Sequence, residues 1–231
     1  MHLSIILRIL GILLMVFSLT LVLPLALAVF NHDNTIGGFV SALGITFLSG
    51  FFLWLPARGA RHELRVRDGF LITSLFWTVL GIFGALPFAL HDGASLSVTD
   101  AIFESISGLT TTGASVITGL DALPVSLLFY RQQLQWLGGI GIVVVAVAIL
   151  PMLGVGGMQL YRAETPGPSK DSKLTPRITE TAKALFLVYV MLTFACGLSY
   201  WAAGMSGFDA ICHAYSTVAI GGFSTHDANM G

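Results

Sequence analysis

Two short segments of the sequence have the residue types needed to bind a monovalent cation through oxygen atoms. They are residues 110–115, with the sequence TTTGAS, and residues 219–224, with the sequence AIGGFS. Stacked backbone carbonyls can replace the hydration shell of such an ion. Successive carbonyls face one axis only where some residues adopt positive φ, which is least costly for glycine. Gly113 and Gly222 are therefore the expected positive-φ residues, and the threonine hydroxyls add further oxygen ligands.

The candidate ligands are mainly the backbone carbonyl groups at the start of each segment. These residues are Thr110, Thr111, Thr112 and Gly113 in the first segment and Ala219, Ile220, Gly221 and Gly222 in the second. Coordination of this kind needs no nucleophile and no covalent cofactor. The sequence offers no arrangement of serine, histidine and acid for nucleophilic catalysis, and its six histidines lack metal-ligand spacing. We therefore expect a protein that is not an enzyme.

The two segments belong to an internal repeat with an offset of 109 residues. Without a gap, six of the sixteen positions from Asp100 match those from Asp209. Each segment follows a short amphipathic stretch, 97–109 or 207–218, which is too short to cross a bilayer and is typical of a re-entrant helix. The negative end of each helix dipole would face the segment that follows it. We call residues 110–115 and 219–224 the first and second filter segments.

The composition predicts that these segments lie in a membrane. Of 231 residues, 55% are hydrophobic and 10% are charged, and the net charge is −1. This argues against a soluble enzyme, and no clustered basic surface is available for nucleic acid. Five apolar stretches are long enough to cross a bilayer as helices: 9–30, 36–55, 69–90, 123–150 and 178–203. We therefore expect an all-α polytopic membrane protein with the lipid bilayer as a partner.

The distribution of charge predicts the orientation of these spans. Ten of the eleven Lys and Arg residues fall on one side, which the positive-inside rule makes cytoplasmic, and the N-terminus lies there too. The opposite side carries only acidic charges, which would attract cations to an outer mouth: Asp33, Asp92, Asp100, Glu104, Asp121, Asp209 and Asp227. Arg131 is the exception within the fourth stretch. It either pairs with Glu104 or extends to the outer interface.

Four stretches of the sequence, taken in order, resemble the TrkH family, the membrane subunits of bacterial Trk potassium uptake systems (the Trk/Ktr/HKT superfamily). They are LTTTGA at 109–114, FYRQQLQWLGG at 129–139, ILPMLGVGGMQLYRAE at 149–164 and IGGFSTH at 220–226. The resemblance implies four helix/pore-loop/helix repeats around one pore, with two leading helices before the first repeat in the sequence. It also implies a homodimer in the bacterial inner membrane that works with a cytosolic nucleotide-binding regulatory subunit.

The resemblance divides the chain into four parts. Residues 1–68 would form the two leading helices and a basic cytoplasmic loop, and residues 69–150 the first repeat, with pore helix 97–109 and filter 110–115. Residues 151–177 would form a second cytoplasmic loop. Residues 178–231 would form an incomplete second repeat, with pore helix 207–218 and filter 219–224. On this interpretation the chain is the N-terminal portion of a transporter and does not conduct alone.

The expected function is potassium uptake through a carbonyl-lined selectivity filter, with K⁺ as the transported ion. Arg131 and Glu104 are structural or gating candidates. Channel-like passage and proton-coupled symport both fit this filter. One alternative is a secondary transporter of a small organic solute, in which the broken helices form a midplane site. The other is a membrane protein that transports nothing.

Overall fold

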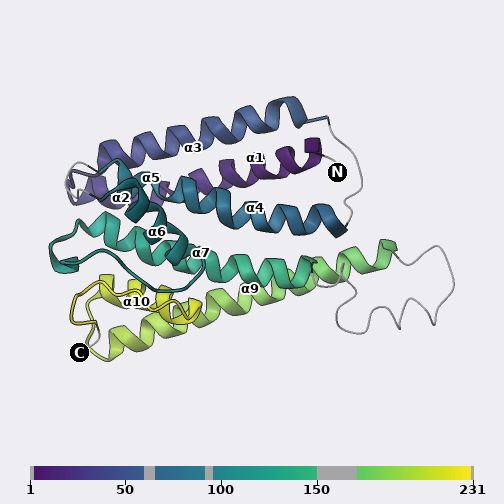
Figure 1. Ribbon diagram of the computed structural model, residues 1–231. Coiled ribbons are helices and arrows are strands. Elements are labelled where there is room, and N and C mark those ends of the chain that lie inside the picture. Colours follow the sequence, from purple (N-terminus) through teal and green to yellow (C-terminus); the bar gives the residue numbers. More distant parts are fainter. Residues whose placement is uncertain (1–2, 60–65, 92–95, 150–170, 230–231) are drawn as a thin grey trace.

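The structure is a computed structural model that describes residues 3–59, 66–91, 96–149 and 171–229 (Figure 1). All of the regular elements in these ranges are helical. Along the chain they are α1 (Leu3–Thr20), α2 (Val22–Phe30), α3 (Ile36–Ala57), α4 (Val66–Gly84), α5 (Leu86–Ala89), α6 (Val98–Leu109), the short 3₁₀ helix η1 (Leu120–Ala122), α7 (Val125–Ile149), α9 (Asp171–Ala202) and α10 (Gly207–Ala219).

Four helical stretches among the described residues are long and apolar enough to cross a membrane. They are Leu3–Phe30, Ile36–Ala57, Asp68–Ala89 and Glu180–Ala202, and they coincide with four of the five predicted spans. The remaining predicted span corresponds to α7, whose 25 residues would extend about 37 Å. The polar residues near the start of α7 are buried inside the protein: Arg131, Gln132, Gln133 and Gln135.

The first and third spans are interrupted, and α7 supplies hydrogen bonds at both interruptions. Pro24 has no N–H to donate to the carbonyl of Thr20, and this carbonyl accepts a 2.8 Å hydrogen bond from Gln133 Nε2 instead. At the break between α4 and α5, the carbonyl of Gly84 accepts a 2.8 Å hydrogen bond from the Tyr130 hydroxyl. An unpaired carbonyl in the hydrocarbon region is costly, so these side chains stabilise the broken spans.

Close packing of small residues joins α1 to α3, which run side by side (Figure 1). A Cβ atom on Gly11 would lie 2.6 Å from the Gly50 carbonyl oxygen, and one on Gly50 would lie 2.7 Å from that of Gly11. Backbones approach this closely in membranes because small residues allow it. The buried core beside this pair includes Tyr130 of α7, whose ring meets Phe39 edge to face at a centroid distance of 5.7 Å.

Helix α7 is the central element of the molecule. It contacts α2, α4, α6, α9 and α10, and Figure 1 shows it between the leading helices and the C-terminal pair. The short helices predicted over 97–109 and 207–218 are confirmed as α6 and α10. Because α7 packs against both of them, it can position the segments that follow them.

The last seven residues of the predicted cytoplasmic loop 151–177 are helical, because α9 begins at Asp171. Hydropathy marks only the part of a helix that suits lipid, and a helix can continue beyond the bilayer into water. The part of the predicted loop at 151–170 lies outside the described residues.

Candidate cation-binding site

The two re-entrant helices begin with the same hydrogen-bonded cap. In α6, Ser97 Oγ accepts the Asp100 N–H at 3.1 Å and donates to Asp100 Oδ2 at 2.7 Å. In α10, Ser206 Oγ accepts the Asp209 N–H at 3.1 Å and donates to Asp209 Oδ2 at 2.6 Å. Ser206 follows Ser97 by the same 109 residues, so the repeat begins three residues earlier than the sequence comparison placed it. Serine is a favoured cap because it satisfies a free backbone donor.

The two re-entrant helices also end in the same way, with a Schellman motif. The N–H groups of Thr111 and Thr112 donate to the carbonyls of Gly108 and Ser107 at 3.0 and 2.9 Å. At the offset positions, Ile220 and Gly221 donate to Thr217 and Ser216 at 3.0 and 2.8 Å. This motif needs a left-handed residue just after the helix, which is usually glycine. Here it is Thr111, with φ of 55°, and Ile220, with φ of 57°.

Positive φ recurs two residues later in each filter segment, as predicted. Gly113 has φ of 73° and Gly222 has φ of 87°. The positive φ of Thr111 and Ile220 was not predicted, because β-branched residues rarely adopt it. The repeat offset was the available signal, since it pairs these two residues at the ends of equivalent helices. Each filter segment therefore changes backbone direction twice within three residues.

The structure brings the two filter segments into contact. A Cβ atom on Gly113 would overlap the carbonyl oxygen of Gly221, so only glycine allows this approach. Around Gly222, by contrast, an added Cβ would meet nothing within 4 Å. An open cavity of about 430 Å³ lies against the second filter segment and is lined by Ser216, Thr217, Ile220, Gly221, Gly222, Phe223 and Asn229. A hydrated ion has room beside this segment.

The threonine hydroxyls of the first filter segment are partly engaged within the protein. Thr110 Oγ1 donates to the Ile106 carbonyl at 2.8 Å and lies 2.8 Å from Thr112 Oγ1. These contacts hold the end of α6 and the segment together. They leave the backbone carbonyls, rather than these two hydroxyls, as the main candidate ligands.

Arg131 forms a buried ion pair with Glu104. The Nε atom lies 2.8 Å from Glu104 Oε1, and the two side chains are 1% and 0% exposed. Glu104 also accepts hydrogen bonds from the Ser115 hydroxyl and the Val116 N–H. Arg131 therefore pairs with Glu104 and does not extend to the outer interface, because a buried charge is tolerated only with such partners. Contrary to expectation, Glu104 is not a carboxylate of the outer mouth.

The guanidinium of Arg131 joins the two filter segments. Its Nη2 donates to the Ser115 hydroxyl of the first segment at 3.0 Å, and its Nη1 donates to the Ser224 carbonyl of the second at 3.0 Å. It also lies 4.3 Å from the ring centroid of Phe223, within the range of a cation–π contact. The sequence offered Glu104 as one of two alternatives for Arg131, and it did not predict these contacts with the second segment.

The second repeat places His213 where the first places Glu104. His213 Nε2 lies 3.3 Å from the Ser224 hydroxyl, and its Nδ1 lies 2.9 Å from the Asp209 carbonyl. In the first repeat, the Ser115 hydroxyl contacts Glu104 in the equivalent way. Each filter segment is thus tied through a serine to a buried polar side chain of its own helix. The offset of 109 residues would have identified this pair from the sequence.

A histidine links the two repeats at the end of the site where α10 begins. His226 Nδ1 lies 2.6 Å from Asp121 Oδ1, and its Nε2 lies 3.3 Å from Asp209 Oδ1. The hydrogen bond with Asp121 raises the pKa of His226 above its usual value of 6.5, and the carboxylate of Asp209 adds to this rise. Nearby, Asp227 Oδ1 accepts the N–H of Gly119 at 3.1 Å. These contacts hold the loop after the first filter segment against the second.

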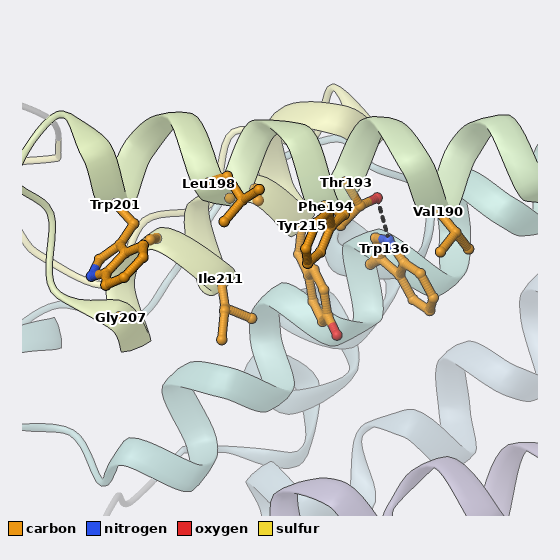
Figure 2. Close-up of a pocket in the computed structure, with 12 residues that line it drawn as sticks. Trp136, Val190, Thr193, Phe194, Leu198, Trp201, Gly207, Ile211 and Tyr215 are labelled. Atoms are coloured by element: carbon orange, nitrogen blue, oxygen red, sulfur yellow. Dashed lines mark hydrogen bonds between the residues drawn. The ribbon is translucent and has the colours of Figure 1, made fainter.

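A larger pocket, of about 460 Å³, lies away from the filter segments between α9 and α10 (Figure 2). Apolar side chains such as Leu198, Trp201 and Ile211 make up most of its lining. The Trp136 N–H, seen in Figure 2, is already paired with the Thr193 hydroxyl at 3.0 Å. The pocket lacks a set of oxygen ligands for a cation. Over the described ranges, no three His, Cys, Asp or Glu residues are grouped so that they could hold a metal ion.

The structure contains two re-entrant helices among membrane-spanning helices, and each is followed by a filter segment with two residues of positive φ. This arrangement defines a multi-pass membrane protein of the pore-loop repeat class. Residues 35–231 match the model of the TrkH family, which is described as a cation transport protein. The chain belongs to this family.

Relatives of known name agree with this assignment. The chain is 66% identical over 231 residues to the Trk system potassium uptake protein TrkH of Halomonas elongata, a match that covers 100% of this chain and 48% of the relative. It is 57% identical to the TrkH of Escherichia coli K12, again over 100% of the chain and 48% of the relative. The chain spans about half the length of the curated relatives it matches.

A solved structure shows the same fold. The crystal structure of the potassium transporter TrkH from Vibrio parahaemolyticus superposes with a TM-score of 0.87 at 53% sequence identity. The match covers 100% of this chain and 46% of that one.

Proposed function

We propose that this chain forms part of the ion pathway of a potassium uptake protein. Potassium would bind to backbone carbonyl oxygens of Thr110, Thr111, Thr112, Gly113, Ala219, Ile220, Gly221 and Gly222. The observation that carries this proposal is the contact between two equivalent left-handed segments, where Gly113 meets the Gly221 carbonyl. The names of the relatives, which are potassium uptake proteins, support potassium as the ion.

The electrostatics of the segments favour a cation. The C-terminal ends of α6 and α10 both lead into filter segments, and a helix C-terminus carries partial negative charge. The nearby positive charge of Arg131 is balanced by Glu104 at 2.8 Å, so it does not repel an approaching ion. The membrane potential would drive entry with about 2.3 kcal/mol per charge per 100 mV. No covalent step is needed, so we propose transport without enzymatic activity.

The proposal extends to location and partners. The side of the membrane with ten of the eleven Lys and Arg residues would be cytoplasmic, which places the N-terminus in the cytoplasm of a bacterial inner membrane. Besides lipid, the partners would be a second copy of the protein and a cytosolic nucleotide-binding regulatory subunit, as the family resemblance implies. Two filter segments do not enclose an ion on all sides, so we propose that they act together with two more.

A hybrid transporter tests the proposed function. In it, this chain replaces the matching first 48% of the Halomonas elongata relative. The hybrid is expressed in bacteria that lack their own potassium uptake systems, and rubidium and sodium uptake are measured. We expect rubidium uptake, with preference over sodium. The proposal fails if the hybrid reaches the membrane without taking up rubidium while the intact relative does so in the same cells.

A further inference from the structure

Gln135 is a buried side chain of the first repeat that contacts the second filter segment. It lies four residues after Arg131 on α7, so both side chains share one face of the helix. Gln135 is fully buried, and its Oε1 accepts the N–H of Phe223 at 3.2 Å. The next residue, Ser224, accepts from Arg131 at 3.0 Å. Two consecutive residues of the second filter segment, Phe223 and Ser224, are therefore hydrogen-bonded to side chains of α7.

The amide of Gln135 also occupies the space that a side chain at position 221 would need. A Cβ atom on Gly221 would lie 2.6 Å from Gln135 Nε2 and would overlap its Cδ and Oε1. Real Cβ atoms essentially never come so close to another heavy atom. The backbone of Gly221 thus rests directly against Gln135.

The other side of Gly221 meets the first filter segment. Its carbonyl oxygen lies where a Cβ of Gly113 would be, so the two backbones are in contact. Gly221 is therefore held between Gln135 on one side and Gly113 on the other. The position of the Gly221 carbonyl depends on both contacts.

We propose that Gln135 is a positioning residue for ion selectivity, which sets the separation of the two filter segments by holding the second from the first repeat. This inference rests on the proposed potassium transport. The cavity size and the field of the coordinating carbonyls are what distinguish one monovalent cation from another. Loss of the hydrogen bond or of the direct contact with Gln135 would let Gly221 shift, which would change both without removing any ligand.

Gln132 provides a matched control on the same helix. It is the same residue type and is also 0% exposed. Neither of its amide atoms has a hydrogen-bond partner among the residues that the structure describes. Replacement of Gln132 by methionine is therefore the same chemical change at an equally buried position, but it breaks no hydrogen bond to a filter segment.

The test compares Gln135→Met and Gln132→Met in the hybrid transporter. Methionine keeps the length of the side chain and removes the acceptor for the Phe223 N–H. We expect the ratio of rubidium to sodium uptake to fall in Gln135→Met by up to about five- to tenfold, the limit set by the free energy of one buried hydrogen bond. In Gln132→Met the ratio should stay within about twofold of the parent. The amount of each variant in the membrane is measured in parallel.

Three results separate the possibilities. A ratio in Gln135→Met within twofold of the parent overturns the inference, and so does an equal fall in both variants, which would indicate general packing. If the parent hybrid takes up no rubidium, the proposed function itself has failed. If Gln135→Met does not reach the membrane, the inference is tested by a double-mutant cycle of Gly221→Ala and Gln135→Ala, in which the rubidium to sodium uptake ratio is measured. Direct contact predicts that the effects of the two changes on this ratio are not additive, and additive effects overturn the inference.

Discussion

The buried pair of Arg131 and Glu104 gives a quantitative prediction about stability. Arg131 donates to Glu104, Ser115 and the Ser224 carbonyl, and both charged side chains are at most 1% exposed. Arg131→Met removes the guanidinium and leaves the Glu104 carboxylate buried with only neutral donors. Breaking a buried pair in this way costs about 3–5 kcal/mol.

The reverse change also leaves one buried charge without its partner, but it should cost less because it keeps more hydrogen bonds. Glu104→Gln keeps an oxygen that can accept hydrogen bonds from Ser115 and Val116, and Arg131 keeps its hydrogen bonds to the Ser115 hydroxyl and the Ser224 carbonyl. The double variant Arg131→Met with Glu104→Gln has no buried charge at this place. It should therefore be more stable than Arg131→Met alone, and the coupling between the two sites should exceed about 1 kcal/mol.

Unfolding of the purified chain in mixed micelles of mild detergent and SDS, followed by loss of helical circular dichroism, measures these free energies. Arg131→Lys is a useful control because it keeps the charge but cannot donate in three fixed directions. A cost below about 1 kcal/mol for Arg131→Met, or simple additivity of the two single changes, would contradict the predicted role of this ion pair.

Three further predictions concern the filter, the loop at its end and the broken first span. Gly113→Ser should lower the rubidium to sodium uptake ratio of the hybrid more than Gly222→Ser. Both changes place a side chain at a residue with positive φ, but only the Cβ at position 113 would also overlap the Gly221 carbonyl oxygen. Equal ratios in the two variants would contradict this prediction. The contribution of His226 to stability should be fully present below about pH 6.5 and lost as the pH rises through its raised pKa in the folded protein; His226→Gln should therefore flatten the dependence of the unfolding midpoint on pH. Gln133→Leu should cost about 1–3 kcal/mol in the unfolding assay by leaving the Thr20 carbonyl unpaired, and a neutral effect would argue against that role.

The sequence predicted those features that follow from local chemistry or from the cost of a buried charge. Gly113 and Gly222 were identified because positive φ favours glycine, and Glu104 was named as one possible partner because a buried Arg131 would require one. Thr111 and Ile220 were missed because the hydrogen bonds that end the helices outweigh the local preference of β-branched residues. Residue type alone does not reveal such an outcome.

Features that depend on how the repeats pack were also beyond the sequence. The contacts from Arg131 to Ser224 and from Gln135 to Phe223 span 93 and 88 residues and exist only after the repeats have docked. The break in the first span was missed for a different reason. Hydropathy averages over Pro24, which is apolar, and takes no account of its missing N–H.

The position of α7 in the chain has a consequence for biogenesis. Its residues leave the ribosome about ninety residues before the second filter segment that Arg131 and Gln135 contact. Glu104 and Ser115 have already been made by then, so they can shield the guanidinium during insertion. The Gln135 oxygen and one Arg131 donor gain their partners only when 223–224 arrives. Completion of the first repeat is therefore a late event in membrane insertion, timed by synthesis of the second.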